Sequence, residues 1–500
     1  MKNFINKKDL LASIVVFLVA LPLCMGIALA SGVSPAKGLV TGIVGGIVTG
    51  FLAGAPLQVS GPAAGLTVLV FELVQNYGIE WLGVSVLGAG LLQYAAGKAG
   101  LGRVFQAVSP AVIKGMLAGI GVLIFSSQFH VMVDDKPRGG GLANLLSIPE
   151  AVGKGLFPAD GTAHHLAAMV GVFTLLSIVL WEKFRPAKLS LVPAPLVAII
   201  GATALVAVAN WPISFISVPT EWSEFVAFPQ VDKLSGINGS IIFSMIALAF
   251  IASAETLLCA TACDALHDGD RADYNKELKA QGIGNMVCGL LGALPMTGVI
   301  VRSSANIKAG GETRQSAIFH GVWLGAFVLV FPSILSYIPT ASLAGILVFI
   351  GYKLVDVQAI KKLNKYSRWE VAIYATTLAT IVAVDLLTGV LAGLALAVLR
   401  TVTSLAHLDV RLDKQEGKVD LRLSGAATFL SLPKLSAALE TIEREKQVVI
   451  HLDKLMFLDH ACLEVLEDFH RLYERQGGTV EMEWTELNRL SKDEKLRVAV

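Results

Sequence analysis

The 500-residue chain has few charged side chains, and this shortage is the first guide to its class. Asp, Glu, Lys and Arg make up 16% of the residues, against roughly 25% in a typical soluble domain. The shortage is uneven, because the last 100 residues hold 32 of the 79 charged residues. An apolar block followed by a charged block is typical of a membrane domain joined to a water-soluble domain.

The chain also lacks what several other classes of protein need. Its net charge is +1, so there is no overall electrostatic attraction to nucleic acid. The five cysteines show neither disulfide nor metal-ligand spacing. The apolar block contains no recognisable pair of nucleophile and base. We therefore expect neither an enzyme nor a bound metal or cofactor.

Long apolar stretches fill the first 406 residues, and we assign these to a transmembrane domain, with residues 407–500 as a cytoplasmic domain. A helix needs about 20 apolar residues to cross a bilayer. The stretches that approach this length predict fourteen spans: 10–30, 38–54, 62–77, 81–98, 109–130, 164–182, 192–209, 239–264, 278–293, 298–307, 316–333, 339–353, 369–386 and 388–405.

The distribution of basic residues between the loops predicts the orientation. With the N-terminus inside, the inside loops collect Lys and Arg, for example at Lys98, Lys276, Lys308 and 361–368. Lys and Arg favour the cytoplasmic side of a membrane. The pattern predicts an even number of spans and both termini in the cytoplasm.

Two predicted spans, 62–77 and 298–307, are too short to cross a bilayer. The stretch LQVSGP (57–62) precedes the first and LPMTGV (294–299) precedes the second, and they align as Leu, any residue, apolar, hydroxyl, Gly. They occupy the third place in each set of seven spans. Short, Gly- and Pro-interrupted segments at matching places indicate inverted repeats with a binding site near the bilayer midplane. The alternative is a chance likeness between two Gly- and Pro-rich turns.

Two half-helices that meet at their N-termini would form a site for an anion. Their unpaired N–H groups and positive dipole ends converge on one point. Ser60 and Thr297 lie near the two N-termini and could donate hydroxyl hydrogens, whereas Gly61 and Gly298 let the backbone approach closely.

Two ionisable residues fall within apolar stretches near this point, and such residues normally mark function. Arg302 would supply positive potential for an anion, and Glu255 is a candidate to carry a coupling proton. A structural ion pair between the two is the alternative. Glu72 also has apolar neighbours, but lies near a predicted span end, and we expect it at the membrane interface.

Four segments of the sequence match a known pattern. They are LPLCMGIA (21–28), VSGPAAG (59–65), NKELKAQGIGN (275–285) and the run 292–306, which contains PMTG and RSSAN. In these segments, and over nearly its whole length, the chain resembles the SulP anion-transporter family.

The resemblance implies a seven-plus-seven inverted repeat divided into a core and a gate, alternating access, and usually a homodimer. It places a small-anion site between the third and tenth half-helices. We carry this site over to Ser60, Gly61, Pro62, Ala63, Ala64, Thr297, Gly298, Val299, Ile300 and Arg302, with Glu255 as the coupling residue. A multi-pass protein of the cell inner membrane follows.

The chain departs from the family pattern at two places. Sodium-coupled bicarbonate members resemble each other in having Asp on the eighth span with Thr four residues later, whereas this chain has Glu255 and Cys259. A hard cation prefers oxygen ligands, so a proton is favoured over sodium. Many members have Pro-Gln in the first span where this chain has Pro22-Leu23.

The charged block alternates strand-like and helix-like segments and predicts a small α/β domain. The segments are 419–423, 432–444, 447–452, 461–473 and 479–484. This domain resembles the STAS domain that ends SulP proteins. Where related domains carry Asp followed by a phosphorylatable hydroxyl, this chain has Asp459-His460-Ala461, so we expect no phosphorylation there.

We therefore expect a secondary active transporter of small inorganic oxyanions, bicarbonate or sulfate, coupled to a proton or another cation. Sodium-coupled bicarbonate symport and a passive exchanger or channel are the alternatives.

Overall fold

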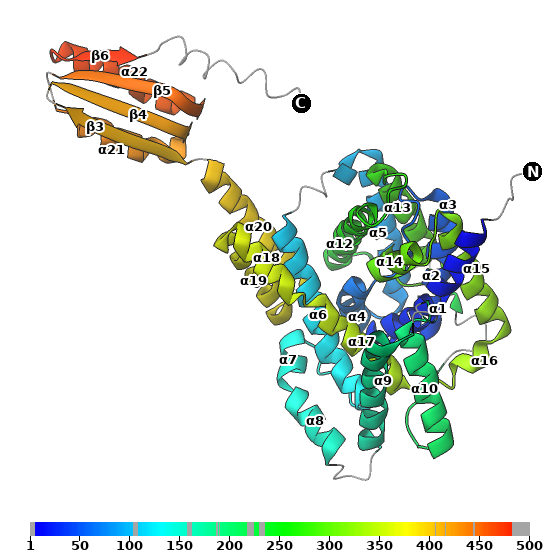
Figure 1. The fold of residues 1–500 in the computed structure, drawn as a ribbon. Coiled ribbons are helices and arrows are strands. Elements are labelled where there is room, and N and C mark those ends of the chain that lie inside the picture. The colour runs from blue at the N-terminus through cyan, green and yellow to red at the C-terminus, as the bar shows by residue number, and fades with distance from the viewer. Residues whose placement is uncertain are drawn as a thin grey trace, which may run out of the picture. The chain divides into compact units, whose positions relative to one another are not determined.

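The computed structural model describes residues 6–103, 109–157, 163–186, 189, 191–217, 225–229, 236–405, 407–415, 417–443 and 446–482. It divides the chain into two compact units, residues 1–394 and 395–500. The described residues of the first unit form helices and two short strands. Figure 1 shows the second unit built on a sheet.

Apolar stretches form helices at all the predicted places. These are α1 (Lys7–Ala30), α2 (Pro35–Val44), η1 (Gly45–Thr49), α3 (Gly50–Leu52), η2 (Ala64–Leu66), α4 (Thr67–Tyr77), α5 (Glu80–Lys98), α6 (Pro110–Met132), α9 (His164–Phe184), α10 (Ala194–Ala209), α12 (Gly239–Asp264), α13 (Tyr274–Leu290), α14 (Ile300–Lys308), α15 (Gln315–Val330), α17 (Thr340–Leu354), α19 (Arg368–Ala383) and α20 (Leu386–Leu405). The last of these helices, α20, continues past residue 394 into the second unit.

Short elements connect these helices. They are the strands β1 (Ser60–Pro62) and β2 (Met296–Gly298) and the helices α7 (Gly141–Leu146), α8 (Ile148–Leu156), α16 (Pro332–Leu335) and α18 (Val357–Tyr366). Within the described residues, seven helical segments are long and apolar enough to cross a membrane, and α10 and α15 are shorter apolar helices. The number fourteen therefore stays a prediction.

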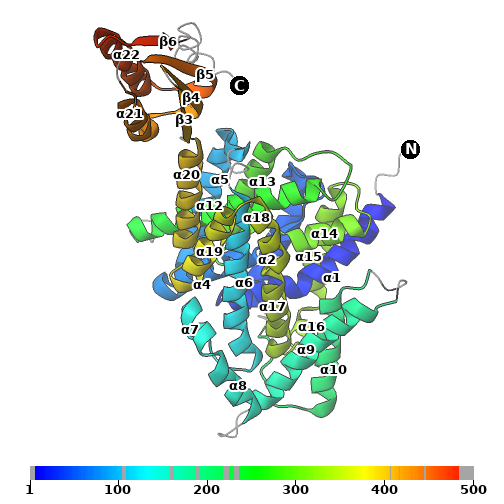
Figure 2. The same cartoon turned by 60° about the vertical axis from the view of Figure 1, so that its left-hand side comes forward.

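The helices of the first unit pack as two groups (Figures 1 and 2). In one group, α5 packs against α13 and α12, and α1 packs against α2 and α15. In the other group, α6 packs against α17 and α19, and α9 packs against α10 and α17. We name these the α5–α13 group and the α6–α17 group.

Backbone packs directly against backbone in the α5–α13 contact. A Cβ added at Gly282 of α13 would lie 2.5 Å from the Tyr94 amide nitrogen and 2.8 Å from the Gly90 carbonyl oxygen of α5. Such close approach needs small residues, which are enriched where helices pack in membranes.

The second unit is a four-stranded sheet with two helices. The strands β3 (Leu408–Gln415), β4 (Lys418–Ala427), β5 (Gln447–Leu458) and β6 (Thr479–Met482) lie in that order. The β3–β4 pair is antiparallel, whereas β5 runs parallel to both β4 and β6. The predicted strand 479–484 extends beyond the described residues at 483 and 484.

Alternating side chains of this sheet form the core of the second unit. Val419, Leu421 and Leu423 of β4 are fully buried with residues of α21 (Leu432–Glu440) and α22 (His460–Arg475). The start of α22 is the Asp459-His460-Ala461 segment. Asp459 caps the helix by accepting a hydrogen bond from the Cys462 N–H at 2.8 Å, whereas His460 is exposed.

The α5–α13 contact generates a stability prediction. Gly282→Ala should lower the free energy of unfolding by about 1–3 kcal/mol, because its methyl group would meet backbone that cannot move aside. The measurement is thermal unfolding of the purified protein in detergent. Gly239→Ala is the matched control, since nothing lies within 4 Å of its Cβ position. Equal melting temperatures for the two variants would contradict the packing described.

Candidate functional site

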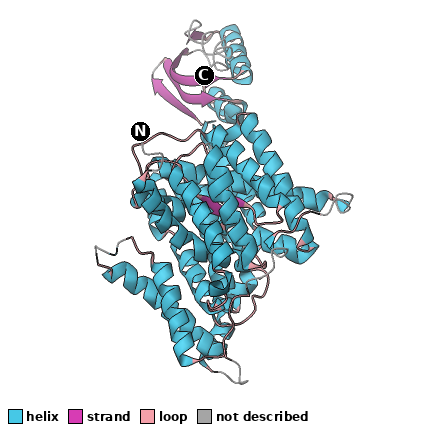
Figure 3. Ribbon diagram, turned by 90° about the vertical axis from the view of Figure 1, so that its right-hand side faces the viewer, coloured by secondary structure: helices cyan, strands magenta, loops and turns pink. Residues whose placement is uncertain are grey.

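The two Gly-containing segments singled out in the sequence meet inside the helices. The strands β1 and β2 pair antiparallel, with Ser60 opposite Gly298, Gly61 opposite Thr297 and Pro62 opposite Met296. Figure 3 shows this strand pair surrounded by helices. The prediction that segments 57–66 and 294–303 lie together is confirmed.

A row of polar side chains on α13 supports β1. Glu277 is fully buried, and its carboxylate accepts hydrogen bonds from the Gly54 and Ala55 N–H groups at 2.8 and 2.9 Å and from Gln58 Nε2 at 2.7 Å. One turn later, Gln281 Nε2 donates to Ser60 Oγ at 2.5 Å and to Glu277 at 2.9 Å. These bonds fix the chain before β1 to α13.

The next residue of that row holds β2. The Asn285 side chain accepts from the Met296 N–H at 2.8 Å and donates to the Met296 carbonyl oxygen at 3.0 Å. It also donates to Gln93 Oε1 of α5 at 2.6 Å. Positions 277, 281 and 285 are four apart and so share one helix face. All three residues belong to the NKELKAQGIGN segment (275–285), and their spacing of four is the signal in the sequence that could have identified this supporting role.

Polar residues of α14 hold the chain just before β1. Ser303 Oγ accepts a hydrogen bond from the Val59 N–H at 2.9 Å, and Asn306 Nδ2 donates to the Leu57 carbonyl oxygen at 3.1 Å. Buried backbone groups need such partners. The chain just before β1 is therefore tied to α14, the half-helix that follows β2.

Both half-helices begin beside the strand pair without a capping side chain. The described N-cap residues of η2, α4 and α14 (Ala63, Leu66 and Val299) make no side-chain capping hydrogen bond. The first amides of a helix lack intrahelical partners, and together they carry a partial positive charge. Two such ends therefore face the same region.

A cavity of about 180 Å³ opens at these helix starts. It is lined by Ala63, Ala64, Gly65, Leu117, Ile120, Glu255, Leu258, Cys259, Ala262, Thr297, Gly298, Val299, Ile300, Val301, Ile350 and Leu354. Of the predicted site residues, Ala63, Ala64, Thr297, Gly298, Val299, Ile300 and Glu255 are in this lining. Residues 117, 120, 350 and 354 belong to the α6–α17 group, so the cavity lies between the two helix groups.

The structure places the other four predicted binding residues outside the lining. Ser60, Gly61 and Pro62 are buried in the strand pair, where Ser60 is occupied by Gln281. The Arg302 side chain is also fully buried, and its Nη2 donates to Cys24 Sγ at 3.3 Å. The guanidinium lies against Gly61, so it is behind the strand pair, not in the cavity.

In this position two donors of Arg302, Nε and Nη1, have no hydrogen-bond partner among the described residues. A buried charge costs several kcal/mol unless it is compensated. Because the guanidinium contacts the far side of β1, it can act on the cavity through its field, and not through a hydrogen bond in this conformation.

Glu255 contributes the carboxylate of the cavity. Its Oε2 accepts a hydrogen bond from Thr297 Oγ1 at 3.3 Å, and its Oε1 lies where a Gly65 Cβ would be. Among the described residues no ion pair joins Glu255 to Arg302, so the alternative of a structural ion pair is not observed. The carboxylate therefore faces the cavity with one hydroxyl partner.

Cys259 lies one turn after Glu255 and also lines the cavity. Its Sγ lies 3.6 Å from Ser303 Oγ and 3.9 Å from Cys263 Sγ. Across the described part of the chain, no group of three or more His, Cys, Asp or Glu is arranged to hold a metal ion. At Cys259 the cavity lining therefore carries a thiol, where a hard cation would prefer an oxygen ligand.

Comparisons with known proteins agree with this architecture. The model of the sulfate permease family matches residues 7–377, and the model of the STAS domain matches residues 409–483. The chain belongs to the sulfate permease family. Members of this family are transporters and not enzymes. This chain has the helical membrane fold of the family and a C-terminal STAS domain.

Curated relatives in the family cover most of the chain. A putative sulfate transporter, YvdB of Bacillus subtilis, is 29% identical over 94% of this chain and 90% of its own. The bicarbonate transporter BicA of Picosynechococcus is 25% identical over 80% of this chain and 71% of its own. The two relatives are therefore named for different anions.

Solved structures share the fold. The transmembrane domain of a cyanobacterial bicarbonate transporter BicA has a TM-score of 0.67 at 25% identity, covering 77% of this chain and 98% of that one. Murine Slc26a9 in the inward-facing state has a TM-score of 0.79 at 17% identity, covering 98% of this chain and 87% of that one. At this identity the second likeness concerns the fold alone.

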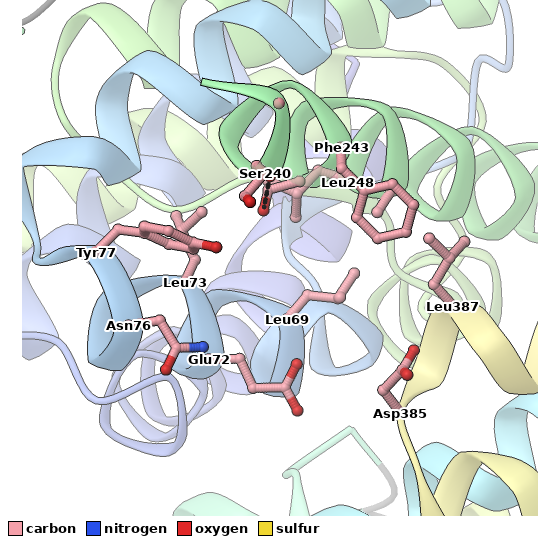
Figure 4. A pocket seen from close by; sticks show the side chains of 13 residues that line it. Leu69, Glu72, Leu73, Asn76, Tyr77, Ser240, Phe243, Leu248, Asp385 and Leu387 are labelled. Atoms are coloured by element: carbon pink, nitrogen blue, oxygen red, sulfur yellow. Dashed lines mark hydrogen bonds between the residues drawn. The ribbon is translucent and has the colours of Figure 1, made fainter. Parts of the chain in front are cut away.

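A second cavity lies between α4 and the first turns of α12 (Figure 4). Its volume is about 450 Å³, and Glu72 and Asp385 both line it. Asp385 accepts from the Thr388 N–H and Oγ1 at 2.8 and 2.6 Å. Glu72 therefore lines a cavity from the middle of α4, and its place at the membrane interface stays a prediction.

The contact between Gly65 and Glu255 generates a prediction for transport. Gly65→Ala should reduce anion uptake at least about tenfold while the protein still folds, because the new methyl group displaces the end of a flexible side chain and not backbone. The measurements are uptake into proteoliposomes and melting temperature in detergent. Gly325→Ala of α15, with nothing near its Cβ position, is the control. Uptake by Gly65→Ala at the control rate would refute the placement of Glu255.

Proposed function

We propose that this protein is a secondary active transporter of small inorganic oxyanions, bicarbonate or sulfate, coupled to a proton by alternating access. The observation that carries the proposal is the cavity at two uncapped half-helix N-termini between two helix groups. The relatives named for sulfate and bicarbonate support this class of substrate.

An oxyanion in this cavity would accept hydrogen bonds from backbone N–H groups at the starts of η2 and α14. Helix N-termini bind anions because free N–H groups and the dipole act together. The Thr297 hydroxyl, now donating to Glu255, could donate to the anion instead. Arg302 behind β1 adds positive potential. The predicted residues Ser60, Gly61 and Pro62 support the site from the strand pair.

The proposal of alternating access rests on a cavity whose lining comes from both helix groups. The strand pair is tied to α13 and α14 by buried hydrogen bonds, whereas the opposite wall comes from α6 and α17. A movement of the α5–α13 group against the α6–α17 group would open the cavity to either side in turn. We further propose that the protein is a homodimer in the cell inner membrane, with both termini in the cytoplasm.

Coupling to a proton rests on Glu255. An anion brought beside an ionised carboxylate is repelled, and this repulsion is large where water is scarce. A proton on Glu255 removes this repulsion. It also leaves the Thr297 hydroxyl available to the anion. Anion and proton would therefore bind together and cross together, which defines symport. Sodium coupling and passive exchange are the outcomes that the following experiment separates.

Glu255→Gln should abolish accumulation driven by a pH gradient and keep exchange of labelled for unlabelled anion. Glutamine is neutral at every pH, so it imitates the loaded carboxyl without releasing a proton. The measurement is uptake of radiolabelled bicarbonate and sulfate into proteoliposomes, with and without a pH gradient or sodium. Glu72→Gln in the second cavity is the control and should keep coupling. Wild-type uptake that needs sodium and ignores a pH gradient would overturn proton coupling.

Arg302→Met should weaken anion binding at least about tenfold without lowering the melting temperature. The substitution removes a buried charge that has one weak partner, and replacing buried charge by an apolar side chain of similar length is often neutral or stabilising. The measurements are anion affinity by calorimetry and thermal unfolding. Arg302→Lys should keep part of the affinity. Unchanged affinity in Arg302→Met would show that the field of Arg302 does not act on the site.

A further inference from the structure

The helix α18 is short and basic and lies between two apolar helices. Val355 and Asp356 separate it from α17, and Ser367 separates it from α19. Ala359 and Leu363, four apart, are buried and hold α18 against α19. The opposite face is exposed. A helix with one apolar and one basic face beside membrane-spanning helices is typical of the membrane interface.

The exposed face of α18 is a stripe of three lysines. Lys361, Lys362 and Lys365 follow Gln358 at spacings of three, four and seven residues, so all four side chains lie on one side of the helix. Within the described residues no carboxylate pairs with any of the three lysines. Three positive charges that have no carboxylate partner in the described part of the chain therefore lie on the exposed face of α18.

An apolar groove of about 460 Å³ begins where this stripe begins. It lies between α6, α7 and the α17–α18 junction, and Gln358 is part of its lining. The lining residues are Val122, Phe125, Leu145, Gly351, Tyr352, Lys353, Val355, Asp356, Val357 and Gln358.

The two charged residues of the groove are already engaged. Lys353 Nζ pairs with Glu182 at 2.7 Å, and Asp356 caps α18 by accepting from the Gln358 N–H at 2.9 Å. The space left is thus bounded mainly by apolar side chains. It suits a hydrocarbon chain and not a charged group.

Exposed aromatic residues flank the basic stripe. Tyr352 is 69% exposed, Tyr366 86% and Trp369 56%. Arg368, also exposed, stands between the last two. Tyr and Trp are enriched where a protein meets lipid headgroups, and clusters of Lys and Arg beside a spanning helix attract anionic lipids.

We propose that this surface binds an anionic phospholipid, with an acyl chain in the groove and the phosphate on Lys361, Lys362 and Lys365. An acidic protein segment would satisfy the lysines, but it would leave the apolar groove and the exposed aromatic rings without partners. A lipid satisfies all three features at once. The proposal does not depend on which anion is transported.

The site adjoins the wall of the transport cavity. Ile350 and Leu354 of α17 line that cavity, and the groove includes Gly351, Tyr352 and Val355 of the same helix end. Lipid bound here therefore contacts the helix that forms one side of the transport cavity. The headgroup composition of the membrane would then affect transport rate.

The test uses the purified full-length protein and fluorescent phosphatidylglycerol, titrated in detergent micelles against phosphatidylcholine. The variant K361Q/K362Q/K365Q removes the stripe. The matched control K98Q/K276Q/K308Q removes three exposed lysines of the α5–α13 group. Each lysine near an anionic lipid contributes about fivefold in binding, so the stripe variant should bind phosphatidylglycerol at least about tenfold more weakly, and the control should bind like wild type.

Three further results complete the test. Raising ionic strength should weaken phosphatidylglycerol binding to the wild type, because exposed charges are screened by salt; this measurement needs no variant. Equal affinity for phosphatidylcholine, or an unchanged affinity in the stripe variant, would overturn the proposal. Binding of water-soluble glycerophosphoglycerol as tightly as of phosphatidylglycerol would also overturn it, because the groove would then contribute nothing.

Discussion

The pairing of β1 with β2 is the interaction on which the rest of the first unit depends. Backbone inside a membrane domain must find hydrogen-bond partners within the protein. The two interrupted spans meet this requirement together, because each strand supplies hydrogen-bond partners for the backbone of the other. The pairing also sets where η2, α4 and α14 begin, and so where their free amides point.

The polar side chains around the strand pair follow from the same constraint. Glu277 and Asn285 on α13, and Ser303 and Asn306 on α14, satisfy backbone groups that three-residue strands leave unpaired, and Gln281 joins the Ser60 and Glu277 side chains. Polar groups are costly at this depth unless they are hydrogen-bonded. In this region they stabilise an irregular backbone that a continuous helix would not need.

Much of this arrangement was predictable from the sequence. Hydrophobic length gave the helices, because span length is fixed by the bilayer. The matching LQVSGP and LPMTGV segments predicted that two half-helices meet at their starts, because Gly and Pro interrupt helices at both places. The pairing of residues 60–62 with 296–298 as strands was not predicted. The segments of the STAS domain were also located, except β3, whose polar residues 413–415 hide its alternation.

Other features needed three-dimensional contacts. Arg302 was predicted near the anion, yet its direction is decided by Cys24 and Gly61, which are more than 240 positions away in the sequence. Likewise Glu72 seemed to end a span, but the α4 helix starts later than predicted, and this shift places Glu72 mid-helix. The α18 stripe was seen only as loop charge, because its helical phase depends on the cap at Asp356.

The tie between Glu277 and the chain before β1 has a consequence for the thermodynamics of transport. Because Gly54, Ala55 and Gln58 are held by one carboxylate of α13, the strand pair and its helix travel as a single rigid piece. In the transport cycle proposed above, the N–H groups at the anion site would then keep the same geometry on both sides of the membrane. The direction of net flux would follow from the gradients alone, as it does for any carrier.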